Sequence, residues 1–251
     1  MKEKLSIVKI GGNIIEDEAS LKAFLKLFSN LEGKKILVHG GGSSVDAQLK
    51  QAGFTTEKKD GKRITPAEQM PIISGALAGA VNKSIVATAT SMKIPAVGLS
   101  LTDGGIVSCQ LNKLDLGAVG IPKAQDSKLL DTLLKANFLP VISSIGALPS
   151  GELVNVNADD AAVVICQLLN AQLLLLTDVN GVKGANGEYL AQLDSTTAQQ
   201  LINDGVIAGG MTAKVNAAFY AANQLRRSIA VASWQAPEQI INLLNGELIG
   251  T

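Results

Sequence analysis

Short strand-like runs alternate with helical patterns along almost the whole chain, and this alternation constrains the fold more than any other feature. Alternation of this kind is typical of βαβ crossovers, so we expect an α/β fold, a three-layer αβα sandwich with a mainly parallel central sheet. The predicted strands are residues 5–10, 35–39, 96–99, 139–144, 172–177 and 229–233. The predicted helices are residues 21–31, 45–52, 66–92, 128–136, 158–170, 196–203, 213–225 and 237–245.

Two glycine-containing stretches interrupt the alternation. Residues 55–65 contain Asp60-Gly61 and residues 182–190 contain Asn186-Gly187, and both dipeptides are typical of hairpin turns. A helical pattern ends near residue 170 and a new strand follows it. We therefore expect two lobes, residues 1–170 and residues 171–251.

The composition fits such a sheet and excludes several function classes. Hydrophobic residues make up 47% of the chain and aromatic residues only 3%, which is typical of a parallel sheet covered on both faces. The 22 basic and 22 acidic residues cancel, so we expect no nucleic-acid or membrane partner. Cys109, Cys166 and a single histidine cannot build the usual His/Cys metal clusters. With no apolar run of signal-peptide or membrane-span length, we expect a cytoplasmic protein.

Glycines follow the first two predicted strands. Gly11-Gly12 ends the first strand, and Gly40-Gly41-Gly42 ends the second and opens a helix. Ligands of open α/β sheets bind at the carboxyl ends of strands, where glycines let backbone N–H groups approach an anion. The chain has no P-loop, and Val45 breaks the dinucleotide fingerprint. The loops thus predict an anion site of another kind, with a pair of tight turns as the alternative.

Charged residues near these loops are candidates for chemistry. Lys9 ends the first strand, and Lys214 is predicted in the first turn of a helix, where its charge opposes the helix dipole. Asp159 could hold the two lysines, although a role at a helix start capped by Asn157 explains it equally well. Arg63 could clamp a substrate carboxylate or simply be a surface residue of the hairpin.

The only histidine, His39, lies at a strand end. A histidine in this position is more often satisfied by backbone hydrogen bonds than catalytic, and we expect that here. We also expect both cysteines to be small core residues.

The order of these motifs resembles the amino acid kinase family. The matching segments are Lys-x-Gly-Gly at 9–12, His-Gly-Gly-Gly at 39–42, Gly-x-Arg-x-Thr-Pro at 61–66, Gly-Ala-Leu-Ala-Gly at 75–79, Asn-x-Asn-Ala-Asp at 155–159, Thr-Asp-Val-x-Gly at 177–181 and Gly-Gly-Met-x-x-Lys at 209–214. Within the family, the set is similar to kinases that transfer the γ-phosphate of ATP to the side-chain carboxylate of N-acetyl-L-glutamate in arginine biosynthesis.

The resemblance implies a role for each matching position. Lys9 and Lys214 would contact the transferring phosphoryl group, and Asp159 would orient both lysines. The implied substrate-binding residues are Gly41, Gly42, Arg63 and Asn155. The implied nucleotide-binding residues are Gly11, Gly12, Asp178, Val179, Asn180, Gly181, Val182, Lys183, Val206, Ile207 and Ala208. Mg²⁺ would be carried by the ATP phosphates, without dedicated protein ligands.

The resemblance also implies an organisation and leaves alternatives. Residues 1–170 would bind the acylamino acid and dimerise through residues 66–92, and residues 171–251 would bind ATP. A homodimer insensitive to arginine is expected, because the additional N-terminal helix of arginine-inhibited relatives is not found. The acceptor could instead be acetylaminoadipate, succinylglutamate or another acylated amino acid. A catalytically silent binding subunit is disfavoured because Lys9, Asp159 and Lys214 are all present.

Overall fold

A six-stranded sheet forms the centre of the molecule. The computed structural model describes residues 4–59, 62–177, 181–190 and 192–245. The strand order is β12-β11-β1-β2-β8-β5, and every pairing in this sheet is parallel. The bounds are β1 (Leu5–Ile10), β2 (Lys34–His39), β5 (Ala96–Ser100), β8 (Leu139–Ser143), β11 (Gln172–Thr177) and β12 (Ala230–Ser233). All six were predicted to within one residue at each end.

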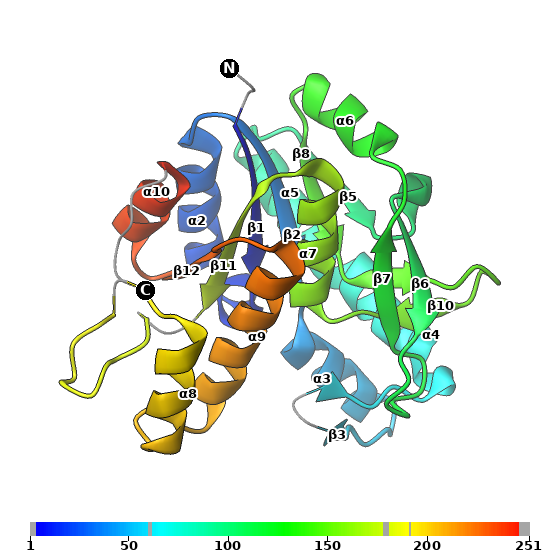
Figure 1. Ribbon diagram of the computed structural model, residues 1–251. Coiled ribbons are helices and arrows are strands. Elements are labelled where there is room, and N and C mark those ends of the chain that lie inside the picture. Colours follow the sequence, from blue (N-terminus) through cyan, green and yellow to red (C-terminus); the bar gives the residue numbers. More distant parts are fainter. Residues whose placement is uncertain (1–3, 60–61, 178–180, 191, 246–251) are drawn as a thin grey trace.

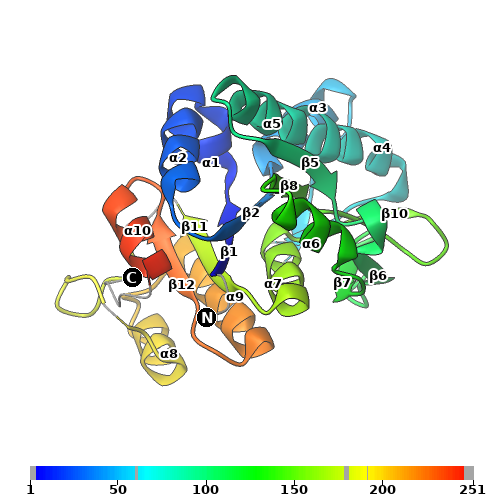
Figure 2. The same ribbon diagram turned by 90° about the horizontal axis from the view of Figure 1, so that it is seen from above.

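Helices cover both faces of this sheet, which confirms the three-layer arrangement (Figure 2). One face packs on α2 (Glu18–Asn30), α5 (Asn82–Ser91) and α10 (Pro237–Asn245). The other packs on α6 (Lys128–Lys135), α7 (Ala158–Leu169) and α9 (Gly210–Leu225). Successive strand residues point to opposite faces, so Ile7 joins the second layer while Val8 and Ile10 join the first.

Among the described residues, three small antiparallel ribbons accompany the central sheet. They are β3–β4 (Lys58–Lys59 and Lys62–Arg63), β6–β7 (Val107–Leu111 and Gly120–Ala124) and β9–β10 (Ile145–Ala147 and Leu153–Asn155). The first confirms the hairpin expected over residues 55–65, although its turn, Asp60-Gly61, lies outside the described residues. The second hairpin is also confirmed, because Leu190 N–H donates to Val182 O at 2.9 Å. The β6–β7 and β9–β10 ribbons were not predicted.

Residues 67–91 form the continuous helix that the sequence predicts, but its centre is not α-helical. It runs through a 3₁₀ turn (Ala67–Gln69), α4 (Met70–Ser74), the π-helical segment η2 (Gly75–Val81) and α5. The buried side chains of the helix before η2 and those after it belong to different hydrophobic clusters. Met70 and Ile73 pack with α3, whereas Ile85 and Ala89 pack under the central sheet.

Helices α1 (Gly12–Glu16) and α3 (Gly42–Gln51) begin two and three residues after β1 and β2 end, at the carboxyl edge of the sheet (Figure 1). Helix α8 (Ser195–Asn203) precedes α9. Helices α2, α3 and α9 begin three residues earlier than predicted. In α2 the cause is Asp17, whose carboxylate accepts the Ser20 N–H at 2.8 Å and caps the helix.

Helices α7 and α9 are joined at their carboxyl ends by Arg227. Its Nη2 group donates to the carbonyl of Ala171 and lies 3.1 Å from Cys166 Sγ. Its Nη1 group reaches Asn170 Oδ1 at 3.4 Å. Because Ala171 directly precedes β11, this arginine also fixes the end of α7 to the start of that strand.

Candidate active site

The two glycine loops lie side by side at the carboxyl edge of the sheet. Strands β1 and β2 are paired with Ile10 opposite His39, so the residues that follow them leave the sheet together. A Cβ atom added to Gly12 would lie 3.3 Å from Ser43 Oγ, which shows how closely the first loop approaches the start of α3. The first N–H groups of α1 and α3 have no partner within their own helices and therefore suit an anion.

Gly41 has a conformation and a packing that only glycine allows. Gly41, which directly precedes α3, has a φ of 152° and a ψ of 44°. An added Cβ would lie 3.0 Å from Leu77 Cδ2 and 3.2 Å from Val81 Cγ2, both in the π-helical segment η2. The Gly41 carbonyl accepts the Val45 N–H at 3.0 Å. The bend of this loop is thus fixed on one side by α3 and on the other by η2.

Lys9 and Asp159 form an ion pair. Lys9 Nζ lies 2.9 Å from Asp159 Oδ1, with side-chain exposures of 18% and 23%. Asn157 caps α7, and its Oδ1 accepts the backbone N–H groups of Asp159 at 2.8 Å and Asp160 at 3.3 Å. Asn157 thus starts the helix as expected, and the carboxylate of Asp159 holds one of the two predicted lysines, Lys9.

Asp160 is a feature of the site that sequence reasoning assigned only to the helix start. The pKa of this carboxyl group is raised to about 6, mainly by burial. The positive charge of Lys62 acts to lower the pKa, and the negative charge of Asp159 adds to the rise. Burial, with the charge of Asp160 as the second cause, also raises the pKa of Tyr220 on α9. The first turn of α7 thus lies within electrostatic range of Lys62 on β4 and Tyr220 on α9.

Arg63 is held in place by a residue that the sequence did not reveal. Its Nη1 group lies 2.5 Å from Asp46 Oδ1, and its Nη2 group donates to Gly42 O at 3.3 Å. Burial acts to raise the pKa of Asp46, but the hydrogen bond and charge of Arg63, with Lys58 and Thr56, bring it below its usual value. The arginine therefore lies against the second glycine loop and is not a free surface residue.

Asn155 ends β10 close to the same region. Its Nδ2 group donates to Thr65 Oγ1 at 3.1 Å, and its backbone N–H donates to Ala118 O at 2.9 Å. Thr65 is fully buried and follows the β3–β4 hairpin that carries Arg63. The structure thus ties Asn155 to the segment of Arg63.

Lys214 lies in the second turn of α9, not the first, because the helix begins at Gly210. The preceding Gly209 has a φ of 57°, a conformation that lets the chain turn directly into the helix. Across the described ranges, no carboxylate pairs with Lys214. The ion pair that is present joins Asp159 to Lys9, so the two lysines are not bridged by this aspartate here.

The remaining predicted residues belong to the region of β11, α8 and α9. Val182 packs with Ile207 in a cluster that includes Ala198, Leu201 and Val215. The Ile207 side chain is 2% exposed and belongs to this core, whereas Val206 is 41% exposed and Ala208 is exposed as well. Gly181 is buried, and Lys183 Nζ lies 5.3 Å from the centre of the Tyr189 ring. Asp178, Val179 and Asn180 lie outside the described residues.

His39 is not available for acid–base chemistry, as expected from the sequence. Its side chain is fully buried, and burial lowers the pKa of the ring to about 4. Cys109 and Cys166 are free, buried thiols, and burial raises the pKa of Cys109 to about 11. Within the ranges that the structure describes, no group of three His, Cys, Asp or Glu side chains could hold a metal ion.

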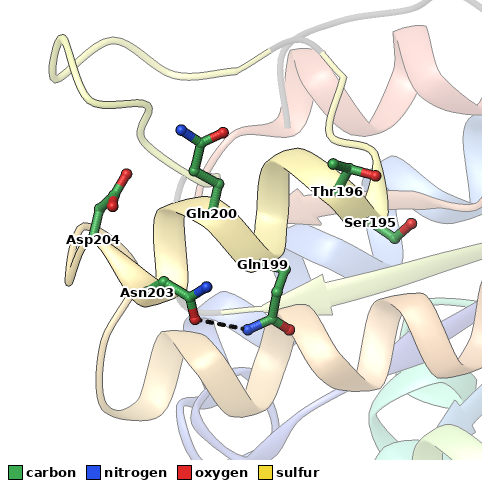
Figure 3. A pocket seen from close by; sticks show the side chains of 6 residues that line it. All are labelled: Ser195, Thr196, Gln199, Gln200, Asn203 and Asp204. Carbon is green, nitrogen blue, oxygen red and sulfur yellow. Dashed lines mark hydrogen bonds between the residues drawn. The ribbon is translucent and has the colours of Figure 1, made fainter.

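A hollow lined by polar side chains lies on the surface of α8 (Figure 3). It is lined by Ser195, Thr196, Gln199, Gln200, Asn203 and Asp204. Gln199 Nε2 donates to Asn203 Oδ1 at 3.0 Å, so part of its hydrogen-bonding capacity is already used. None of the sequence-predicted residues lines it.

Comparison with known proteins covers almost the whole chain. The acetylglutamate kinase of Colwellia psychrerythraea strain 34H is 68% identical over 246 residues, which span 98% of this chain and 95% of that protein. The acetylglutamate kinase of Aeromonas hydrophila subsp. hydrophila is 46% identical over 257 residues, spanning 100% and 98%. The solved structure of Giardia carbamate kinase has the same fold, with a TM-score of 0.64, 17% identity and coverage of 100% and 98%.

The sequence profile of the amino acid kinase family matches residues 4–233. These residues include both glycine loops, the pair formed by Lys9 and Asp159, and Lys214. The parallel sheet, the motif order and this match agree: the chain belongs to the amino acid kinase family.

Proposed function

We propose that this chain transfers the γ-phosphate of ATP to the γ-carboxylate of N-acetyl-L-glutamate, giving N-acetyl-L-glutamyl 5-phosphate for arginine biosynthesis. The observation that carries the proposal is the ion pair of Lys9 and Asp159 beside two glycine loops. A relative that is 68% identical along nearly its full length is named acetylglutamate kinase, which supports the substrate.

The arrangement suits a carboxylate acceptor. A side-chain carboxylate with an unperturbed pKa of about 4.3 is already ionised at neutral pH, so no general base has to activate it. Phosphoryl transfer then needs in-line positioning and neutralisation of the charge on the phosphoryl oxygens. Lys9 supplies a cation at the end of the central strand β1, and Asp159 fixes its direction. Lys214 supplies a second cation from α9.

The second glycine loop and the β3–β4 hairpin form the acceptor side of the site. The backbone N–H groups of Gly41 and Gly42 at the start of α3 are donors for a substrate anion. Arg63 presents a planar fork, of which Nη1 is engaged by Asp46. Its other N–H groups bind the α-carboxylate, and Asn155 binds the acetylamino end.

The nucleotide side of the site is formed by the first glycine loop and by residues 171–251. Gly11 and Gly12 contact the ATP phosphates through backbone groups. Residues 181–183 and 206–208 line the nucleotide pocket. Mg²⁺ carried by the ATP phosphates would neutralise part of their charge.

The apolar helix over residues 67–91 supports a homodimer. Contrary to the expectation from the sequence, this helix is long and apolar enough to cross a membrane, as core helices of soluble proteins also can be, and only 39% of its most apolar 18-residue stretch is buried within one chain. A second copy of the chain would cover the remaining apolar surface. Small residues such as Gly75 and Gly79, beside which an added Cβ meets no atom within 4 Å, permit close approach of two such helices.

The test is ATP consumption by the purified protein with Mg²⁺ and hydroxylamine, which converts an acyl phosphate into a hydroxamate. N-acetyl-L-glutamate is compared with acetylaminoadipate, succinylglutamate and free glutamate. We expect hydroxamate with N-acetyl-L-glutamate alone. A preference for another acylated acid would keep the chemistry and change the substrate, and silence with all four would favour a non-catalytic binding subunit.

A further inference from the structure

Behind the second glycine loop lies a buried polar pair that the proposed mechanism does not use. His39 at the end of β2 and Asn82 at the start of α5 are both fully buried. Asn82 Nδ2 lies 2.9 Å from His39 Nε2, and His39 Nδ1 lies 2.8 Å from the carbonyl oxygen of Gly40. Together they connect α5, which follows the π-helical segment η2, to the loop that precedes α3.

The surroundings of Asn82 decide which way its amide points. Its Nδ2 group lies 2.9 Å from the carbonyl oxygen of Val141 and 3.3 Å from that of Leu99. A carbonyl oxygen only accepts hydrogen bonds, so the amide group that faces these two strand ends must be the NH₂ donor. The opposite atom, Oδ1, accepts from Lys83 Nζ at 3.1 Å, which agrees with this orientation.

The orientation of Asn82 then decides the tautomer of His39. Because Asn82 presents a donor, His39 Nε2 must accept, and in a neutral imidazole the proton then lies on Nδ1. Burial lowers the pKa of His39 to about 4, so the ring is neutral at physiological pH. The Nδ1–H group donates to Gly40 O. With the proton on Nε2 instead, Nδ1 and the Gly40 oxygen would be two acceptors facing each other.

The hydrogen bond to Gly40 O also orients the next N–H group. The Gly40 C=O and the Gly41 N–H belong to one planar trans peptide unit and point in opposite directions. Holding the carbonyl toward the buried ring therefore directs the Gly41 N–H away from it. The carbonyls of Gly41 and Gly42 have their own partners, Val45 N–H and Arg63 Nη2, so each peptide of the loop has one fixed direction.

We propose that Asn82 is a positioning residue for the acceptor loop, which fixes the Nδ1–H tautomer of His39 and thereby the direction of the Gly41 N–H. This inference rests on the proposed function for its effect on N-acetyl-L-glutamate binding. The tautomer and the loop orientation are independent of that function and can be measured without any turnover.

The first experiment is NMR spectroscopy of the ¹⁵N-labelled protein. The chain contains one histidine, so the imidazole signals need no assignment by mutation. In the folded protein we expect Nδ1 to carry the proton and Nε2 to carry none, with no titration of the ring between pH 5.5 and 8. In the urea-unfolded chain the imidazole of His39 should titrate with a pKa of about 6.5. A proton on Nε2 in the folded protein would overturn the inference.

The second experiment compares Asn82→Leu with Ile85→Ala, a buried core residue of the same helix whose apolar side chain cannot hydrogen-bond to His39. We expect Asn82→Leu, but not Ile85→Ala, to shift the Gly41 amide signal and to raise the KM for N-acetyl-L-glutamate roughly tenfold, the effect of one lost hydrogen bond. The KM for ATP should stay within about twofold. An unshifted Gly41 amide in Asn82→Leu would overturn the inference.

A second variant covers the case in which Asn82→Leu does not fold. A Cβ added to Gly98 would lie 2.1 Å from Asn82 Oδ1, so Gly98→Ala displaces the Asn82 amide without removing it. We expect it to shift the imidazole and Gly41 signals in the same way. A wild-type protein that shows the Nδ1–H tautomer but phosphorylates none of the four acids would refute the proposed function alone.

Discussion

Lys9 Nζ and Asp159 Oδ1 are 2.9 Å apart, and they come from the central strand β1 and the first turn of α7. These two elements are also in contact through the hydrophobic core, where Ile7 and Ala161 belong to one cluster. The position of the lysine ammonium group is therefore set by the core of the protein and not by a mobile surface loop. This arrangement leads to separate predictions for the cation and for its partner.

Replacing Lys9 by methionine removes the charge and keeps most of the side-chain volume. We expect kcat to fall by about 10²–10³-fold, as for other groups that stabilise developing charge. The melting temperature should change little, since a partly exposed ion pair contributes at most about 1 kcal/mol. The hydroxamate assay and a thermal melt measure both effects. Wild-type kcat in this variant would remove Lys9 from the mechanism.

Asp159→Asn tests the orienting role separately from the helix start. Asn157 caps α7 through backbone N–H groups, which this substitution leaves in place, so the stability should be retained. We expect a lower kcat with an unchanged KM for N-acetyl-L-glutamate. Asn157→Ala is the matched control, and it should lose about 1 kcal/mol of stability through the missing cap. Equal destabilisation by both variants would contradict the orienting role.

Lys214→Met should reduce kcat without reducing stability. The side chain has no carboxylate partner among the described residues, so its removal breaks no ion pair. Lys22→Met is a suitable control, since Lys22 pairs with Glu18 on the distant helix α2 at 2.6 Å. We expect normal turnover in that control and a loss of about 10²-fold or more in Lys214→Met. Equal turnover in the two variants would exclude Lys214 from phosphoryl transfer.

The raised pKa of Asp160 predicts that the stability of the protein depends on pH. Its folded pKa of about 6 exceeds the unfolded value near 3.8, so the folded state binds the proton more tightly. The free energy of unfolding should therefore fall as pH rises from about 4 to about 6. Asp160→Asn removes this loss, and we expect it to stabilise the protein by on the order of 2 kcal/mol at pH 7.5. Urea unfolding at pH 4 and pH 7.5 measures the difference, which should vanish at the lower pH.

Gly41→Ala should damage the acceptor loop. The new Cβ meets Leu77 and Val81 and forces an alanine into an unfavourable backbone region, which costs about 1–3 kcal/mol. We expect a higher KM for N-acetyl-L-glutamate as well. Gly151→Ala is the control, because Gly151 in the β9–β10 turn also has a positive φ, 92°, but open space at its Cβ position. An equally raised KM in Gly151→Ala would show that the effect is not specific to the acceptor loop.

The sequence predicted the central sheet because its strands are buried on both faces and read as short apolar runs. The β6–β7 ribbon escaped prediction because Leu111 and Ile121 are 52% and 46% exposed, so apolar residues do not mark its buried side. The π-helical turn escaped because its Gly, Ala, Leu and Val residues suit any helix. Sequence spacing alone cannot place η2 within residues 67–91.

Within the site, residues that act through their own motif were easier to predict than residues that act through a partner. The motif of Lys9 pointed to a charge at a strand end, and the structure gives that charge a carboxylate. Asp46 was missed because its partner Arg63 is 17 residues away and only the fold brings the two together. Asp160 was missed because a carboxylate in a first helical turn already has a sufficient local explanation.

The π-helical segment η2 makes the number of residues in this helix as important as their identity. Each residue of an α-helix turns the chain by about 100°, so deleting one residue from Gly75–Val81 would rotate α5 by that angle relative to α4. Met70 and Ile73 could then keep their partners only if Ile85 and Ala89 lost theirs, and Asn82 would no longer face His39. Substitutions in this segment change one contact at a time, whereas a single-codon deletion would put the two halves of the helix out of phase.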